Sequence, residues 1–132
     1  MIAVRELAKD YRDNGTATRA LAGVSFAIRE GEFVAVMGPS GSGKSTLLHI
    51  LSFLDRPSDG NYEFRGRRMD ELSDTELARI RNREMGFVFQ AFNLLAKTTA
   101  TDNVELPLIY SGVKKEERRK RAIIELTQVG LG

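Results

Sequence analysis

One segment constrains the fold more than any other: residues 38–45 read GPSGSGKS and match the pattern G-x-x-x-x-G-K-[ST] in full. Glycine lets the backbone bend sharply and leaves its N–H groups free to surround phosphate oxygens. A helix that begins directly after such a loop directs its free N–H groups and its positive dipole end at the same anion. The sequence therefore predicts a phosphate-binding loop between a strand and a helix.

The members of this loop have separate expected roles. Lys44 would reach the β- and γ-phosphates of ATP, and the hydroxyl of Ser45 would ligate Mg²⁺. The other residues expected to contact the nucleotide are Gly38, Pro39, Ser40, Gly41, Ser42, Gly43 and Thr46. A glycine-rich turn without a ligand is the alternative, and the strand–loop–helix context favours the phosphate site.

Two compact apolar runs indicate buried strands. Residues 33–37 (FVAVM) precede the loop and show no alternation of polar and apolar side chains, as expected of a strand covered on both faces. Residues 85–89 (MGFVF) form the second run, which ends at Gln90. A helix is expected from about Lys44, with apolar residues at Leu47, Leu48, Ile50, Leu51 and Leu54.

Shorter strands and turns precede and follow this core. Residues 2–7 are expected as a strand, residues 13–15 (DNG) as a turn, and residues 61–64 as another strand. Val24, Phe26 and Ile28 alternate with Ser25, Ala27 and Arg29, which is the period of a half-buried strand. Strands that alternate with helices after an antiparallel start predict an α/β fold with an antiparallel β edge.

Helices dominate the later part of the chain. Ser73 and Glu76 form a capping box, which predicts a helix to about Arg83. A short segment near residues 104–110, interrupted by Pro107, precedes a last helix at about residues 114–129, with Gly130 as its C-cap. Its charged run KKEERRKR has favourable i,i+4 pairs, which favours a solvated helix face over a nucleic-acid patch.

Composition sets the broad class. The chain has 132 residues, and its 20 basic side chains exceed its 18 acidic ones by only 20 − 18 = 2, too little to indicate nucleic-acid binding. The longest apolar run, residues 33–37, is far too short to cross a bilayer, and no secretory signal is visible. The absence of cysteine from the sequence fits a cytosolic protein.

Two long segments carry a family resemblance. Residues 20–66 (ALAGVSFAIREGEFVAVMGPSGSGKSTLLHILSFLDRPSDGNYEFRG) and residues 83–95 (REMGFVFQAFNLL) resemble the ABC transporter ATPase family. Residues 76–95 and 101–113 look most like the branch that serves macrolide export and lipoprotein release. The resemblance implies a RecA-like P-loop NTPase core, with MgATP as ligand, a membrane permease as partner, and a location at the inner face of the cell membrane.

The resemblance also implies roles for two residues outside the loop. Tyr11 stands where the family places an aromatic ring that stacks on adenine; the alternative is a partly buried tyrosine at the end of a strand. Gln90 matches the Q-loop glutamine, which in the family contacts Mg²⁺ and the attacking water in a loop that meets the permease. Its alternative is a glutamine that caps a loop.

The resemblance covers the N-terminal part of such a domain. Residues 1–90 would hold the β edge and the core, and residues 91–132 the Q-loop and the start of a helical subdomain. The family continues with an LSGGQ-type signature, an apolar strand ending in Asp-Glu and a switch histidine, none of which occurs in this sequence; the single histidine, His49, lies in the phosphate-loop helix.

We therefore expect a full-length form to dimerise on MgATP and hydrolyse it, and this chain alone to bind ATP without hydrolysis. A soluble ABC ATPase without a transport role is one alternative, and a module that only binds nucleotide is another. A GTPase is least favoured, because no Asn-Lys-x-Asp element occurs in the sequence.

Overall fold

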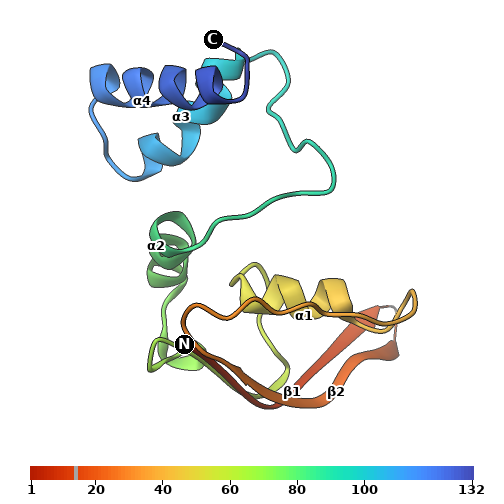
Figure 1. Ribbon diagram of the computed structural model, residues 1–132. Coiled ribbons are helices and arrows are strands. Elements are labelled where there is room, and N and C mark those ends of the chain that lie inside the picture. Colours follow the sequence, from red (N-terminus) through yellow and green to blue (C-terminus); the bar gives the residue numbers. More distant parts are fainter. Residues whose placement is uncertain (14) are drawn as a thin grey trace. The chain divides into compact units, whose positions relative to one another are not determined.

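The computed structural model describes residues 1–13 and 15–132, which divide into two compact units, Met1–Ala78 and Arg79–Gly132. Each unit is described by itself. Along the chain the elements, labelled in part in Figure 1, are β1 (Ile2–Asp13), β2 (Thr16–Ile28), α1 (Lys44–Leu51), β3 (Asp59–Phe64), β4 (Arg67–Arg68), the 3-10 helix η1 (Met69–Glu71), α2 (Asp74–Glu84), α3 (Ala100–Tyr110) and α4 (Lys115–Gln128).

The first unit contains a four-stranded antiparallel sheet in the order β2-β1-β3-β4. The β1–β2 hairpin runs from the pair Ile2↔Ile28 to the pair Asp13↔Thr16, so both strands are longer than the sequence predicted. Of the predicted turn at residues 13–15, Asn14 lies outside the described residues. The antiparallel β edge is confirmed.

Helix α1 lies along one face of this sheet (Figure 1). The alternation predicted for the end of β2 is confirmed, because Val24 and Phe26 are half-buried while Ser25 is exposed. The buried apolar residues of the unit are Val4, Leu7, Leu21, Leu47, Ile50, Phe53, Tyr62, Met69, Leu72 and Leu77. They come from the sheet, from α1 and from the segment around η1 and α2. Burial of this apolar surface holds α1 against the sheet.

A ring cluster supports the C-terminal end of α1. The Tyr62 hydroxyl donates a hydrogen bond of 2.6 Å to the carbonyl oxygen of Leu51. The ring of Phe53 stacks on that of Tyr62 with 5.1 Å between the centroids, and burial raises the pKa of Tyr62. These contacts attach the end of α1 to β3.

The two predicted buried strands are wrong for this structure. Residues 33–37 and 85–89 have no strand structure, and Phe33 and Val88 are each 98% exposed. A strand needs a neighbour that pairs with its N–H and C=O groups. Neither run pairs with a strand among the described residues. Apolar side chains that the pattern predicted to be buried are therefore exposed in each unit taken by itself.

Capping confirms the predicted start of α2. The backbone N–H of Ser73 donates to Glu76 Oε2 (2.9 Å), and the backbone N–H of Glu76 donates to Ser73 Oγ (3.3 Å). This is the reciprocal capping box that the sequence indicated, and the helix runs on to Glu84.

The second unit pairs α3 with α4 through an ion pair between Arg118 Nε and Glu105 Oε2 at 2.7 Å. Pro107 does not interrupt its segment as expected; it lies inside α3, whose start is set earlier by the capping box of Thr99 and Asp102. Gly130 lies at the predicted end of the last helix but is not its C-cap: Val129 is the C-cap, and Gly130 follows it with φ 80°, while the backbone N–H of Leu131 donates to Leu126 O (2.8 Å).

No helix within residues 1–13 and 15–132 combines the length and the apolar character needed to cross a membrane.

Candidate functional site: the loop at residues 38–45

The conformation of the loop depends on Gly43. This residue precedes α1 with φ 86°, in the left-handed region that favours glycine. A Cβ atom there would lie 2.4 Å from the carbonyl oxygen of Ala20 and 2.9 Å from Leu21 Cδ2. Because no side chain fits, glycine allows the start of α1 to approach β2 this closely.

The N-terminus of α1 offers free backbone donors. Its first backbone hydrogen bond runs from Leu47 N to Gly43 O at 2.8 Å, so the N–H groups of Lys44, Ser45 and Thr46 precede the helical bonding pattern. No side chain caps this end, and the first turn has no acidic residue among those described. The helix dipole therefore favours an anion here.

The side chain of Lys44 folds over the loop. Its Nζ atom donates to the carbonyl oxygens of Gly38 (2.9 Å) and Pro39 (2.6 Å) and to Ser42 Oγ (3.3 Å). An ammonium group has three donors. All of them are directed to the loop, so the positive charge is held at the segment that contains the free N–H groups.

A cavity of about 570 Å³ lies between the loop and β2. It is lined by Thr18, Arg19, Ala20, Ser40, Gly41, Gly43, Lys44, Ser45 and Thr46. Among these described residues two are cationic, Arg19 and Lys44, and none is acidic. The cavity therefore suits a negatively charged ligand, although Arg19 Nε also pairs with Asp10 Oδ1 at 2.9 Å.

Sequence reasoning missed the contribution of β2 to this cavity. The register pairs Tyr11 with Thr18 and Asp10 with Arg19. The pair Asp13↔Thr16 sets this register and places Thr18 opposite Tyr11, whereas a turn over residues 13–15 would place Ala17 there. The predicted strands were too short, and the predicted turn was out of register by one residue, so the sequence did not indicate Thr18 and Arg19.

Tyr11 lies on β1, 41% exposed, outside the lining of the cavity. Its hydroxyl donates a hydrogen bond of 2.8 Å to Asp55 Oδ2, and Lys9 Nζ lies 4.9 Å from the centroid of its ring. Its partner across the hairpin, Thr18, does line the cavity. The ring is thus at a strand position next to the loop cavity.

Gln90 belongs to the second unit, and the phosphate loop belongs to the first. Gln90 is exposed in a segment without helix or strand, followed by Phe92, which is 92% exposed. The segment is attached to α3 at Leu95, whose backbone N–H donates to Asn103 Oδ1 (2.8 Å).

The donors in the first unit fit a magnesium nucleotide. The loop supplies free N–H groups, a lysine ammonium and a cavity without acidic residues among those described, which match a polyphosphate. Ser45, in the first turn of α1, supplies a hydroxyl of the kind that ligates Mg²⁺ beside phosphate oxygens. The fold and this site together define a phosphate-loop nucleotide-binding protein.

The comparison with known families identifies the protein more closely. Residues 21–132 match the family described as ABC transporter. The chain belongs to this family, as part of an ATP-binding domain.

Curated relatives and solved structures agree with that assignment. An uncharacterized ABC transporter ATP-binding protein of Thermotoga maritima is 57% identical over 94% of this chain, which covers 53% of that protein. A macrolide export ATP-binding/permease protein MacB of Chlorobaculum tepidum is 51% identical over 99% of this chain, which covers 20% of that protein. A pyoverdine export ATP-binding/permease protein PvdT of Pseudomonas aeruginosa is 48% identical over 99% of this chain, which covers 20% of that protein.

The structure titled as the dimeric post-hydrolysis state of the ATP-binding cassette MJ0796 bound to ADP and Pi matches with a TM-score of 0.87 and 45% identity. The match covers 96% of this chain and 56% of the cassette. The α/β ABC cassette fold is therefore confirmed. The chain spans about half the length of the cassette and of the Thermotoga maritima protein, and about a fifth of the MacB and PvdT proteins.

Proposed function

We propose that this chain forms the nucleotide-binding part of an ABC transporter ATPase, which binds MgATP and in its full-length form hydrolyses it to drive a membrane permease. The observation that carries the proposal is the loop at residues 38–45: free N–H groups, the Lys44 ammonium and a cavity lined without acidic residues, as described above. Family membership supports the same reading.

The residues of the loop bind and orient the triphosphate. On binding, the Lys44 ammonium exchanges the carbonyl oxygens of Gly38 and Pro39 for the β- and γ-phosphates, which are charged and hence stronger acceptors. The N–H groups at residues 41–46 surround the same oxygens. Mg²⁺, bound through Ser45 and the phosphates, would neutralise negative charge on the phosphate oxygens. Tyr11 stacks on the base.

Hydrolysis requires more than this chain contains. In the proposed complete site Gln90 would hold the attacking water and supply an oxygen ligand for Mg²⁺, because an amide can do both without changing its protonation. The sequence has no Asp-Glu pair after an apolar strand and no LSGGQ-type signature. We therefore propose that the chain alone binds nucleotide without turnover.

A permease and a second ATPase domain are the proposed partners. Two of the relatives carry the words ATP-binding/permease in their names, and the solved MJ0796 cassette is titled dimeric. The loop after Gln90 exposes Phe92 (92%) and Leu94 (67%), apolar side chains that favour contact with another protein. We place the protein at the inner face of the membrane and in the export or lipoprotein-release branch.

Cysteine crosslinking tests the transport role. The chain has no cysteine, so Asn93→Cys and Lys97→Cys each introduce a single reactive thiol in the exposed loop. Both should crosslink to a cytoplasmic loop of the cognate permease, whereas the matched control Glu30→Cys, at an exposed turn, should not. Crosslinks only to a second copy of this chain would make the surface a dimer contact, and no permease adduct at all would favour a non-transport ABC ATPase.

A further inference from the structure

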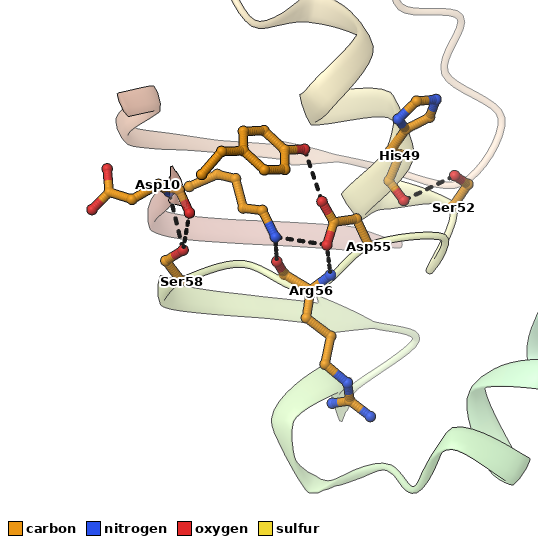
Figure 2. A network of polar contacts seen from close by, with 8 residues as sticks. Asp10, His49, Ser52, Asp55, Arg56 and Ser58 are labelled. Atoms are coloured by element: carbon orange, nitrogen blue, oxygen red, sulfur yellow. Dashed lines mark hydrogen bonds and ion pairs between the residues drawn. The ribbon is translucent and has the colours of Figure 1, made fainter. Parts of the chain in front are cut away.

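A polar network around Asp55, drawn in Figure 2, joins the proposed base-stacking residue Tyr11 to the end of the phosphate-loop helix. Asp55 Oδ2 accepts the hydroxyl hydrogen bond of Tyr11 at 2.8 Å, and Asp55 Oδ1 accepts from Lys9 Nζ at 2.6 Å. Lys9 Nζ also lies 4.9 Å from the centroid of the Tyr11 ring. One carboxylate therefore fixes both the edge of the ring and the cation that covers one of its faces.

Asp55 is itself held firmly. The backbone N–H of Arg56 donates to Asp55 Oδ1 at 2.7 Å, and the backbone N–H of Asp55 donates to the carbonyl oxygen of His49 in α1 at 3.2 Å. Partial burial disfavours the charge of Asp55, but the hydrogen bonds from Lys9, Tyr11 and Arg56 outweigh it and lower the pKa of Asp55 below its ordinary value. The carboxylate is thus ionised at neutral pH, as an anchor for a hydroxyl and an ammonium must be.

The chain connects this anchor to the phosphate site. Helix α1 begins at Lys44, in the phosphate loop, and ends at Leu51, and the segment after it is held to the last turn by hydrogen bonds from Leu54 N and Asp55 N to His49 O. The same helix therefore carries the proposed phosphate-binding groups at its start and holds the backbone of Asp55 at its end. Across the hairpin, Tyr11 pairs with Thr18, which lines the loop cavity.

We propose that Asp55 is a positioning residue for nucleotide recognition: it holds the ring of Tyr11 in place for stacking on the base, at a fixed distance from the phosphate loop. This inference rests on the proposed function, since it takes Tyr11 as the base-stacking residue. A ring that is already ordered loses less conformational freedom when a base stacks on it, and ordering one side chain changes affinity by about threefold to tenfold.

The test separates the base from the phosphates. The ligands are MgATP and magnesium tripolyphosphate, which has no base, titrated onto the full chain. Asp55→Asn keeps the shape and removes the charge, and Tyr11→Phe keeps the ring and removes only the hydroxyl bond to Asp55. Asp70→Asn is the matched control, because Asp70 accepts from Arg68 Nε at 3.1 Å in a similar ion pair elsewhere in the first unit.

We expect Asp55→Asn and Tyr11→Phe each to weaken the binding of MgATP by about threefold to tenfold and to leave the binding of tripolyphosphate unchanged. Asp70→Asn should change the affinity for neither ligand. Equal losses for both ligands, an effect of Asp55→Asn without one of Tyr11→Phe, or no effect of either would overturn the positioning role. In these cases weaker binding of both ligands by Lys44→Ala would still support the proposed function. If Lys44→Ala binds both ligands like the parent chain, the proposed function has failed and the inference falls with it.

Discussion

The Nζ atom of Lys44 lies 2.6 Å from the carbonyl oxygen of Pro39, so the side chain assigned to the phosphates is bonded to its own loop. Neutral carbonyl oxygens are weaker acceptors for an ammonium group than phosphate oxygens, which are charged. A triphosphate in the cavity can therefore draw Lys44 away from Pro39 and Gly38. Under the proposed function, nucleotide binding would replace these two contacts of Lys44.

Base stacking by Tyr11 should be independent of the kind of purine. Tyr11→Ala removes the ring and should lower the affinities for MgATP and MgGTP together, by about 5- to 150-fold if the contact resembles other base–aromatic stacks. Calorimetric titration with the two nucleotides measures both losses. A loss for one nucleotide alone would mean that Tyr11 recognises the edge of the base, and unchanged affinities would leave it a structural residue of β1.

The loop should tolerate a side chain less well at Gly43 than at Gly41. Both residues have positive φ, 86° and 80°, so alanine at either position is strained by about 1–2 kcal/mol. A Cβ at Gly41 meets no atom within 4 Å, whereas one at Gly43 would lie 2.4 Å from Ala20 O. Thermal unfolding followed by circular dichroism should therefore show a larger fall in Tm for Gly43→Ala than for its matched control Gly41→Ala. Equal falls would mean that the loop and β2 do not pack as described.

Local signals in the sequence predicted much of the fold. Three features were located in this way: the start of α1 at Lys44, the capping box of Ser73 and Glu76, and the end of α4 next to Gly130. Each depends on residues within about one turn of each other. Their chemistry is complete within a few residues, so a pattern of residue types is enough to locate them.

Features that need distant partners were predicted less well. Residues 33–37 and 85–89 have the composition of buried strands, but a strand forms only with a neighbour, and Phe33 and Val88 are fully exposed here. The cavity wall formed by Thr18 and Arg19 depends on the register of a hairpin, which the sequence specifies only if both strand lengths are known. The contact between Tyr11 and Asp55 joins residues that no motif relates.

The chain alone should bind nucleotide without turnover. Positioning of the attacking water and of the metal provides most of the catalysis in phosphoryl transfer, and the sequence lacks the acidic pair that the family uses for it. Steady-state phosphate release should equal that of Lys44→Ala, which serves to subtract contaminating ATPase. Release clearly above this background would show that catalytic residues lie elsewhere in the chain.

The most direct test of the account is calorimetric titration of MgATP onto the chain and onto Lys44→Ala. Loss of a charge-assisted contact to the phosphates should weaken binding by at least about tenfold. Lys120→Ala, which removes an equal charge from the exposed face of α4, is the matched control and should bind like the parent chain. Weakened binding in Lys44→Ala alone is the predicted result; equal affinities in all three proteins would contradict the assignment of residues 38–45 as the nucleotide site.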